Sequence, residues 1–149
     1  MLRYSGSEAR DGTLGAMAET IIFAQVTPVL RIFDIAKADE FYLDYLGFRV
    51  DWDHRLADYA PLYRQVSRGD LNLHLSEHYG DGTPGAKIRV AMRGIRAFHA
   101  ELATKDYRFL WPDLETMPWN TLEFAVYDPF GNVIRFAEPI DSVTADNRA

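Results

Sequence analysis

Apolar residues recur with two different periods along this chain, and the order of the periods predicts its fold. Residues Ile21–Ile32 are rich in β-branched and other apolar side chains, which favours a strand, and Pro28 indicates an edge position or a bulge. A helix is expected next, because Asp34 is a good N-cap and Gly47 supplies a C-terminal stop. The apolar residues at helical spacing between them are Ile35, Ala38, Phe41, Tyr42, Tyr45 and Leu46.

Three further strands complete the first half of the chain. They are expected at Phe48–His54, Leu62–Ser67 and Leu71–Ser76. Arg68-Gly69-Asp70 forms a compact hairpin loop between the last two, and residues 79–85 then break every period, as a linker would. The first half therefore has the order βαβββ.

The second half repeats this order, although it shares little residue identity with the first. A strand is expected at Lys87–Met92 and a helix at Ile95–Lys105. Three more strands follow at Tyr107–Trp111, Leu122–Tyr127 and Val133–Glu138. The predicted fold class is α+β, with two βαβββ modules in tandem.

These elements define one folded domain within the 149 residues, which is the usual size of a single domain. The segments outside it lack a sustained period and are expected to be a flexible N-terminal extension and a polar C-terminal tail. The expected boundaries are 1–19 for the extension, 20–140 for the domain, about 21–78 for module 1, 79–85 for the linker, about 86–139 for module 2, and 141–149 for the tail.

Composition narrows the possible partners and chemistry. No apolar run reaches the roughly 18 residues needed to cross a bilayer, and the N-terminus lacks the layout of a secretory signal, so a cytoplasmic protein is expected. The absence of cysteine excludes disulfides, thiolate metal sites and a Cys nucleophile. A net charge of −6 argues against nucleic acid or anionic membrane as a partner. This charge would favour a cationic ligand, or it serves only solubility.

Three stretches together resemble the vicinal-oxygen-chelate superfamily, which contains glyoxalases, bleomycin resistance proteins and dioxygenases. They are Val29–Asp34 leading into Phe41-Tyr42 and Leu46-Gly47-Phe48, then Pro118-Trp119, then Asp128–Asn132 before the final strand. The resemblance spans Phe23–Glu138 and is closest to the bleomycin-binding branch. It implies curved mixed sheets around a cleft, and a homodimer in which both subunits complete each cleft.

Metal-dependent members of that superfamily place His, Gln or Glu on the first and last strand of each module. In this sequence those positions fall on Thr27, His74, Lys87 and Arg135, of which only His74 is a conventional ligand. Two fixed positive charges would repel a divalent cation, and Glu138 has the wrong strand parity to replace a ligand. We therefore expect no metal, no cofactor and no catalytic residue, and favour a binding protein over an enzyme.

The resemblance also implies candidate ligand contacts. Asp51-Trp52-Asp53-His54 lies where bleomycin-binding members place an acidic residue and a stacking aromatic. An indole suits flat heteroaromatic rings and carboxylates suit a cationic tail, although Trp52 could instead pack in the core. Tyr59, in a loop beside Pro61, is another candidate aromatic contact.

Pro118-Trp119 resembles a Pro-Trp-Gly motif of the same branch, with Asn120 in place of the glycine. Asn tolerates unusual backbone angles, so the turn can survive, and Trp119 is expected to stack on the ligand unless its role is structural. His74 and Ser76 share one face of their strand and are expected to line the cleft, with His74 a hydrogen-bonded residue rather than a base.

The sequence thus predicts a protein that sequesters a bleomycin-like glycopeptide antibiotic without catalysis and so confers antibiotic resistance. Two alternatives stay open: a metal-dependent lyase or dioxygenase that uses His74, and a binding protein for another small metabolite. The predicted ligand contacts are Asp51, Trp52, His54, Tyr59, His74, Ser76 and Trp119.

Overall fold

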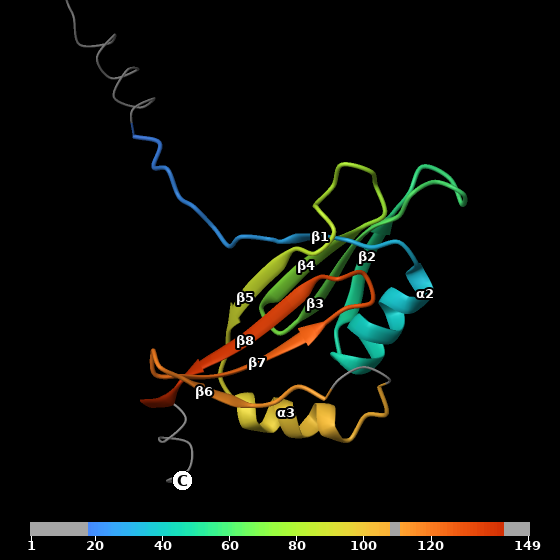
Figure 1. The fold of residues 1–149 in the computed structure, drawn as a ribbon. Helices are drawn as coiled ribbons and strands as arrows, with labels where there is room; N and C mark the ends of the chain where they lie inside the picture. The colour runs from blue at the N-terminus through green and yellow to red at the C-terminus, as the bar shows by residue number, and fades with distance from the viewer. Residues whose placement is uncertain (1–17, 108–110, 142–149) are drawn as a thin grey trace, which may run out of the picture.

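The computed structural model describes residues 18–107 and 111–141, which form two four-stranded mixed sheets (Figure 1). Sheet A has the strand order β1-β4-β3-β2 and comes from the first half of the chain. Sheet B has the order β5-β8-β7-β6 and comes from the second half. The predicted α+β fold with two tandem βαβββ modules is confirmed.

The first module contains one helical segment, between β1 and β2, close to where the sequence predicts a helix. Asp34 caps the helix, since its side chain accepts a hydrogen bond from the Lys37 backbone N–H at 2.9 Å. The helix then continues as a π-helix and ends before Gly47. The elements are β1 (Val29–Arg31), α2 (Ile35–Ala38), π-helix η1 (Asp39–Tyr45), β2 (Arg49–His54), β3 (Tyr63–Arg68) and β4 (Leu71–Ser76).

Sheet B repeats the arrangement around one longer helix. In both sheets the first strand runs parallel to the last, β1 beside β4 and β5 beside β8, while the other neighbours are antiparallel. The elements are β5 (Lys87–Ala91), α3 (Ile95–Ala103), β6 (Glu115–Met117), β7 (Thr121–Tyr127) and β8 (Val133–Pro139).

Two strand predictions differ from the structure. The strand predicted at Ile21–Ile32 is confined to β1, because β4 pairs with it only there, and a strand needs a neighbour for its backbone groups. The strand predicted at Tyr107–Trp111 lies mostly outside the described residues, and neither of its ends is in a strand. In its place β6 pairs with β7, which a turn at Asn120 brings alongside.

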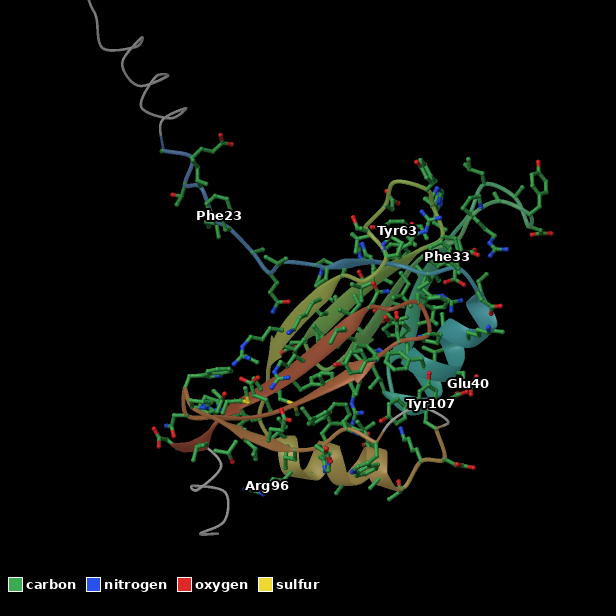
Figure 2. The ribbon with its side chains drawn as sticks, viewed as in Figure 1. Phe23, Phe33, Glu40, Tyr63, Arg96 and Tyr107 are labelled. Atoms are coloured by element: carbon green, nitrogen blue, oxygen red, sulfur yellow. The ribbon has the colours of Figure 1, made fainter. Side chains whose placement is uncertain are left out.

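The segment before β1, residues 18–28, leaves the domain as an extended arm. Figure 2 shows Phe23 on this arm, away from both sheets. The exposed fractions of its large apolar side chains are 81–92%. We use the name "arm" for these residues below, and its apolar side chains are Ile21, Ile22, Phe23 and Val26.

One hydrophobic core joins the two modules. The inner faces of both sheets and their helices contribute to it, with Phe41, Tyr42 and Phe124 fully buried. Polar contacts tie the modules together at its edge: the Tyr42 hydroxyl donates to Asp128 at 2.7 Å, and Asn132 donates to the Arg31 carbonyl at 2.9 Å. Because the inner faces are filled, the outer face of each sheet, turned away from this core, is where a ligand can reach.

The described helices include none that is both long and apolar enough to span a membrane.

Candidate functional site

Three aromatic rings form a cluster on the outer face of sheet A. Trp52 stacks on Tyr63 with ring centroids 6.0 Å apart and planes 10° from parallel. His74 meets both rings edge-on, at 5.2 Å from each. Tyr63, labelled in Figure 2, lies on β3, and Trp52 and His74 come from its two neighbouring strands, β2 and β4. We call Trp52, Tyr63 and His74 the aromatic cluster.

Trp52 is therefore not a core residue, since 41% of its surface is exposed and it packs against outer-face neighbours. Its position follows from strand pairing: Trp52 lies opposite Gln65, and Gln65 lies opposite His74. Cross-strand neighbours on one face approach within side-chain contact distance, so these three strands place their side chains side by side. A flat ring could stack on the remaining open surface of the indole.

A β-bulge between Val50 and Trp52 places Asp51 on the same outer face. The Asp51 carboxylate accepts hydrogen bonds from Gln65 Nε2 and from the Ser67 hydroxyl, both at 3.0 Å. These hydrogen bonds lower the pKa of Asp51, chiefly the bond from Gln65, and keep it ionised at neutral pH. An anion thus lies next to the exposed indole.

His74 is held by hydrogen bonds at both ring nitrogens. Gln65 Oε1 accepts from Nε2 at 3.0 Å, and the Tyr63 hydroxyl lies 2.7 Å from Nδ1. Because an amide oxygen can only accept, Nε2 carries the proton and Nδ1 accepts from Tyr63. This arrangement is that of a fixed lining residue. It leaves no ring nitrogen open to act as a base or to bind a metal.

Ser76 lies on the same face but is covered by the linker. Its hydroxyl donates to Asp81 at 2.9 Å and accepts from the His78 backbone N–H at 3.0 Å, and the residue has no exposed surface. A ligand would touch Ser76 only if the linker moved. The observed role of its side chain is to fasten residues 78–81 to β4.

His54 and Tyr59 lie beyond the aromatic cluster. His54 ends β2 opposite Tyr63 and is exposed. Tyr59 is 95% exposed in the loop between β2 and β3. It lines a separate hollow of about 340 Å³ whose other lining residues are Ile35, Arg55, Asp58, Ala60, Pro61 and Glu77.

Trp119 belongs to the other sheet. It lies in the turn between β6 and β7 and is 58% exposed, and its Nε1–H donates to Glu123 at 2.8 Å. Among residues 18–107 and 111–141, no ring contact joins Trp119 to Trp52. The predicted ligand contacts are therefore divided between two faces of one chain.

Three functional candidates were missed by sequence reasoning. Tyr63 and Gln65 complete the network around His74, and Glu123 holds Trp119. A signal existed for Gln65: the compact loop between β3 and β4 fixes the antiparallel register, which places Gln65 opposite His74. Nothing in the sequence pattern marks Glu123, because its partners come from β5 and β8 as well as from its own turn.

The side chains at the metal positions do not fit a divalent cation. Val29, and not Thr27, lies opposite His74, and Thr27 precedes β1. Arg135 lies opposite Arg89, and both form ion pairs with Glu123. Within the described ranges, no group of three or more His, Cys, Asp or Glu side chains could hold a metal. One histidine with both nitrogens engaged is too poor a donor set.

The parity argument about Glu138 is confirmed. Its carboxylate accepts a hydrogen bond from the Ile95 backbone N–H at 2.8 Å, and the residue is buried. Glu138 therefore lies on the helix side of β8 and satisfies the first turn of α3, where a carboxylate is favoured by the helix dipole. It cannot reach the outer face without a change of register.

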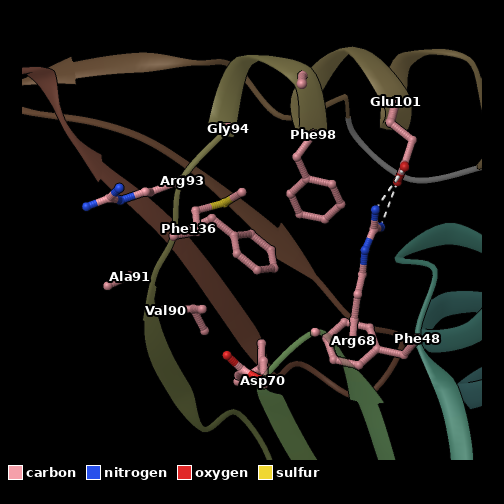
Figure 3. A pocket seen from close by; sticks show the side chains of 14 residues that line it. Phe48, Arg68, Asp70, Val90, Ala91, Arg93, Gly94, Phe98, Glu101 and Phe136 are labelled. Carbon is pink, nitrogen blue, oxygen red and sulfur yellow. Dashed lines mark hydrogen bonds and ion pairs between the residues drawn. The ribbon is translucent and has the colours of Figure 1, made fainter. Parts of the chain in front are cut away.

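A cavity of about 690 Å³ lies at the seam between the modules (Figure 3), and no residue of the aromatic cluster lines it. Arg68 of β3 crosses the seam and pairs with Glu101 of α3 at 2.7 Å, while its guanidinium lies over the Phe98 ring. Apolar side chains form most of the remaining wall, and none of the seven predicted ligand contacts lines it. Those apolar residues include Phe48, Leu71, Val90, Met92 and Phe136.

A family model described as a glyoxalase superfamily protein matches residues 9–143. Among solved structures, the bleomycin-binding protein of bleomycin-producing Streptomyces verticillus, complexed with copper(II)-bleomycin, is 32% identical with a TM-score of 0.54. The match covers 78% of this chain and 97% of that one.

Two further structures share the fold. A bleomycin-binding protein complexed with bleomycin is 22% identical, with a TM-score of 0.60 and coverage of 78% of this chain and 98% of that one. A glyoxalase-related enzyme from Clostridium phytofermentans is 21% identical, with a TM-score of 0.62 and coverage of 80% and 98%. No curated protein sequence matches the chain.

Proposed function

The chain belongs to the glyoxalase superfamily, and from this membership we propose that it sequesters a bleomycin-like glycopeptide antibiotic without catalysis. The observation that carries the proposal is the aromatic cluster on the outer face of sheet A, with the Asp51 carboxylate beside it. The similarity to a protein that binds copper(II)-bleomycin supports the same ligand class.

The chemistry of the outer face matches a ligand with a flat heteroaromatic part and a cationic part. Stacking on the exposed indole of Trp52 provides apolar contact and a π face, which a neighbouring cation also prefers. Asp51 is ionised and next to the indole, so it would attract a positively charged tail. Both kinds of contact are available within one cross-strand neighbourhood.

Sequestration requires tight binding and no bond cleavage. A dissociation constant of about 1 nM corresponds to roughly −12 kcal/mol, which is more than an open sheet face gives a small molecule. A second surface must therefore close over the ligand. We expect a homodimer, in which Trp52 of one subunit and Trp119 of the other contact one ligand, and the exposed apolar arm favours such association.

The proposed action fits a cytoplasmic protein whose partner is a small molecule. The net charge of −6 opposes binding to nucleic acid, so the protein would intercept the drug and not shield its target. The positively charged side chains of Arg89 and Arg135 lie where metal-dependent members of the superfamily would hold a cation, so metal-dependent chemistry is not favoured.

The test is a titration of the purified protein with metal-free bleomycin, followed by calorimetry and by tryptophan fluorescence. We expect saturable binding of one ligand per subunit, with a dimer mass in light scattering. Unrelated cationic heteroaromatic compounds serve as the comparison. Absence of saturable binding by folded protein would reject the proposal, and tighter binding of a comparison compound would identify a binding protein for another metabolite.

A further inference from the structure

Glu123 is a fully buried carboxylate on the outer face of sheet B. Its neighbours along β7, Leu122 and Phe124, point into the hydrophobic core, so the Glu123 side chain must point away from it. A carboxylate on an outer sheet face is normally solvated. Here other side chains cover the Glu123 carboxylate completely, and the contacts that they make with it indicate its role.

Four donors converge on this carboxylate. Arg89 of β5 forms an ion pair with it at 2.5 Å, and Arg135 of β8 forms a second through its Nε. Thr121 donates its hydroxyl at 2.6 Å. The fourth donor is the indole Nε1–H of Trp119, at 2.8 Å. These bonds, that of Arg89 foremost, hold the pKa of Glu123 far below its usual range, so the acceptor stays charged.

Trp119 is at once highly exposed and fixed. The exposed fraction of Trp119 is 58%, larger than that of Trp52 at 41% or Trp111 at 47%. The turn beneath it is held by the Asn120 N–H, which donates to the Met117 carbonyl at 3.0 Å, with Asn120 in the left-handed region at φ 65°. The backbone hydrogen bonds position Cα, and the bond to Glu123 fixes how the ring is turned.

We propose that Glu123 is a positioning residue that fixes the indole of Trp119 on the outer face of sheet B as a preorganised platform for a flat aromatic group. The two arginines serve this role by neutralising the carboxylate, which lets it remain buried while it accepts the indole N–H. An aromatic side chain that is already immobile loses less entropy when a ligand stacks on it.

The ligand contact in this inference rests on the proposed function, but the fixing of the ring does not. The two can therefore be tested separately. Nuclear magnetic resonance of protein with ¹⁵N-labelled tryptophan shows one indole N–H signal for each of the three tryptophans. Trp119→Phe assigns the relevant signal by its loss.

The expected result is that the Trp119 indole N–H exchanges with solvent at least tenfold more slowly than the indole N–H groups of Trp52 and Trp111. Residue exposure alone predicts the reverse order, because Trp119 is the most exposed tryptophan of the three. Exchange of the Trp119 signal as fast as in an unstructured peptide would overturn the inference. The exchange rates themselves are measured on the wild-type protein, and Trp119→Phe serves only to assign the signal.

Glu123→Met keeps the length of the side chain and removes both acceptor oxygens. Its Trp119 signal should lose the protection, while circular dichroism confirms that the sheet persists. The matched control is Arg89→Met, which breaks one ion pair of the same cluster but leaves the indole hydrogen bond, so protection should remain. Retained protection in Glu123→Met would contradict the role assigned to the carboxylate.

The second half of the inference, that the ring is a platform for a ligand, is tested with metal-free bleomycin. If the chain binds it, Glu123→Met should raise the dissociation constant about tenfold, and Arg89→Met much less. Binding that Trp119→Phe and Glu123→Met leave unchanged would show that the fixed ring is not a platform for this ligand, which overturns that half of the inference. If the wild-type chain does not bind, the proposed function fails, and the exchange rates alone still decide the positioning role.

Discussion

On the outer face of sheet A, His74 is hydrogen-bonded to the uncharged side chains of Tyr63 and Gln65. On the outer face of sheet B, Glu123 lies between the guanidinium groups of Arg89 and Arg135. Removing the Tyr63 hydroxyl or the Gln65 amide costs one hydrogen bond to His74, which water can partly replace at a half-exposed site. Removing the Glu123 carboxylate from sheet B leaves Arg89 without this counter-charge and leaves Arg135 with the more exposed Glu115. We therefore expect ligand choice to depend more on sheet A and folding stability more on sheet B.

The largest effect is expected for Glu123→Met. Loss of the buried carboxylate should lower the free energy of unfolding by about 2–3 kcal/mol, because Arg89 and Arg135 keep their charge beside an apolar side chain. Urea unfolding followed by circular dichroism measures the change. A loss no greater than that of Tyr63→Phe would remove the contrast between the two faces.

Trp52→Ala should have the next largest effect, and it should act on binding. We expect the dissociation constant for metal-free bleomycin to rise about 10- to 30-fold through loss of the stacking surface, with little change in unfolding free energy. Trp111→Ala is the matched control, since that indole is similarly exposed but packs against His99, away from sheet A. Equal losses in both variants would argue against a specific role for the aromatic cluster.

A smaller effect is expected in the pH dependence of the unfolding free energy, to which Glu123 of sheet B contributes. The pKa of Glu123 is lowered in the folded state, so its contribution is fully present above the ordinary glutamate pKa of roughly 4.3 and is lost as the pH falls below it. The difference in unfolding free energy between wild type and Glu123→Met should thus shrink between pH 6 and pH 3. A difference that stays constant over this range would show that the carboxylate is not the titrating group.

The smallest effect is expected for Tyr63→Phe, which keeps the stacked ring and removes the donor to His74 Nδ1. The unfolding free energy should fall by about 0.5–1 kcal/mol. Bleomycin binding should weaken less than in Trp52→Ala, since the aromatic surface is unchanged. A larger loss of binding than in Trp52→Ala would mean that the hydrogen-bonded orientation of His74, and not the indole, selects the ligand.

Much of this fold was predictable because local signals and pairing agree. The period of apolar residues located most of the strands, and the loop Arg68-Gly69-Asp70 fixed the register that brings Gln65 to His74. The superfamily resemblance is confirmed by the match over residues 9–143. Strand parity also placed Glu138 correctly, on the helix side.

The remaining features depend on partners that are distant in sequence. The length of β1 follows from where β4 ends its pairing, which the β-branched residues of the arm do not reveal. Ser76 has the predicted parity, but Asp81 of the linker covers it. Glu123 gains its role from Arg89 and Arg135, which only sheet formation brings to it. The ligand contacts themselves stay predictions.

The bulge in β2 has a consequence for how the binding face could be altered. Val50 pairs with Val66 and Trp52 with Gln65, so Asp51 is the extra residue that β3 does not match. Deleting Asp51 would restore a regular ladder and leave Trp52 opposite Gln65, and it would remove the carboxylate together with its ion pair to Arg49 at 3.3 Å. The extra residue of this edge strand therefore carries a charge of the face that can be removed without a change in the pairing of Trp52. A single-codon deletion could shift the preference of this site from cationic to neutral aromatic compounds.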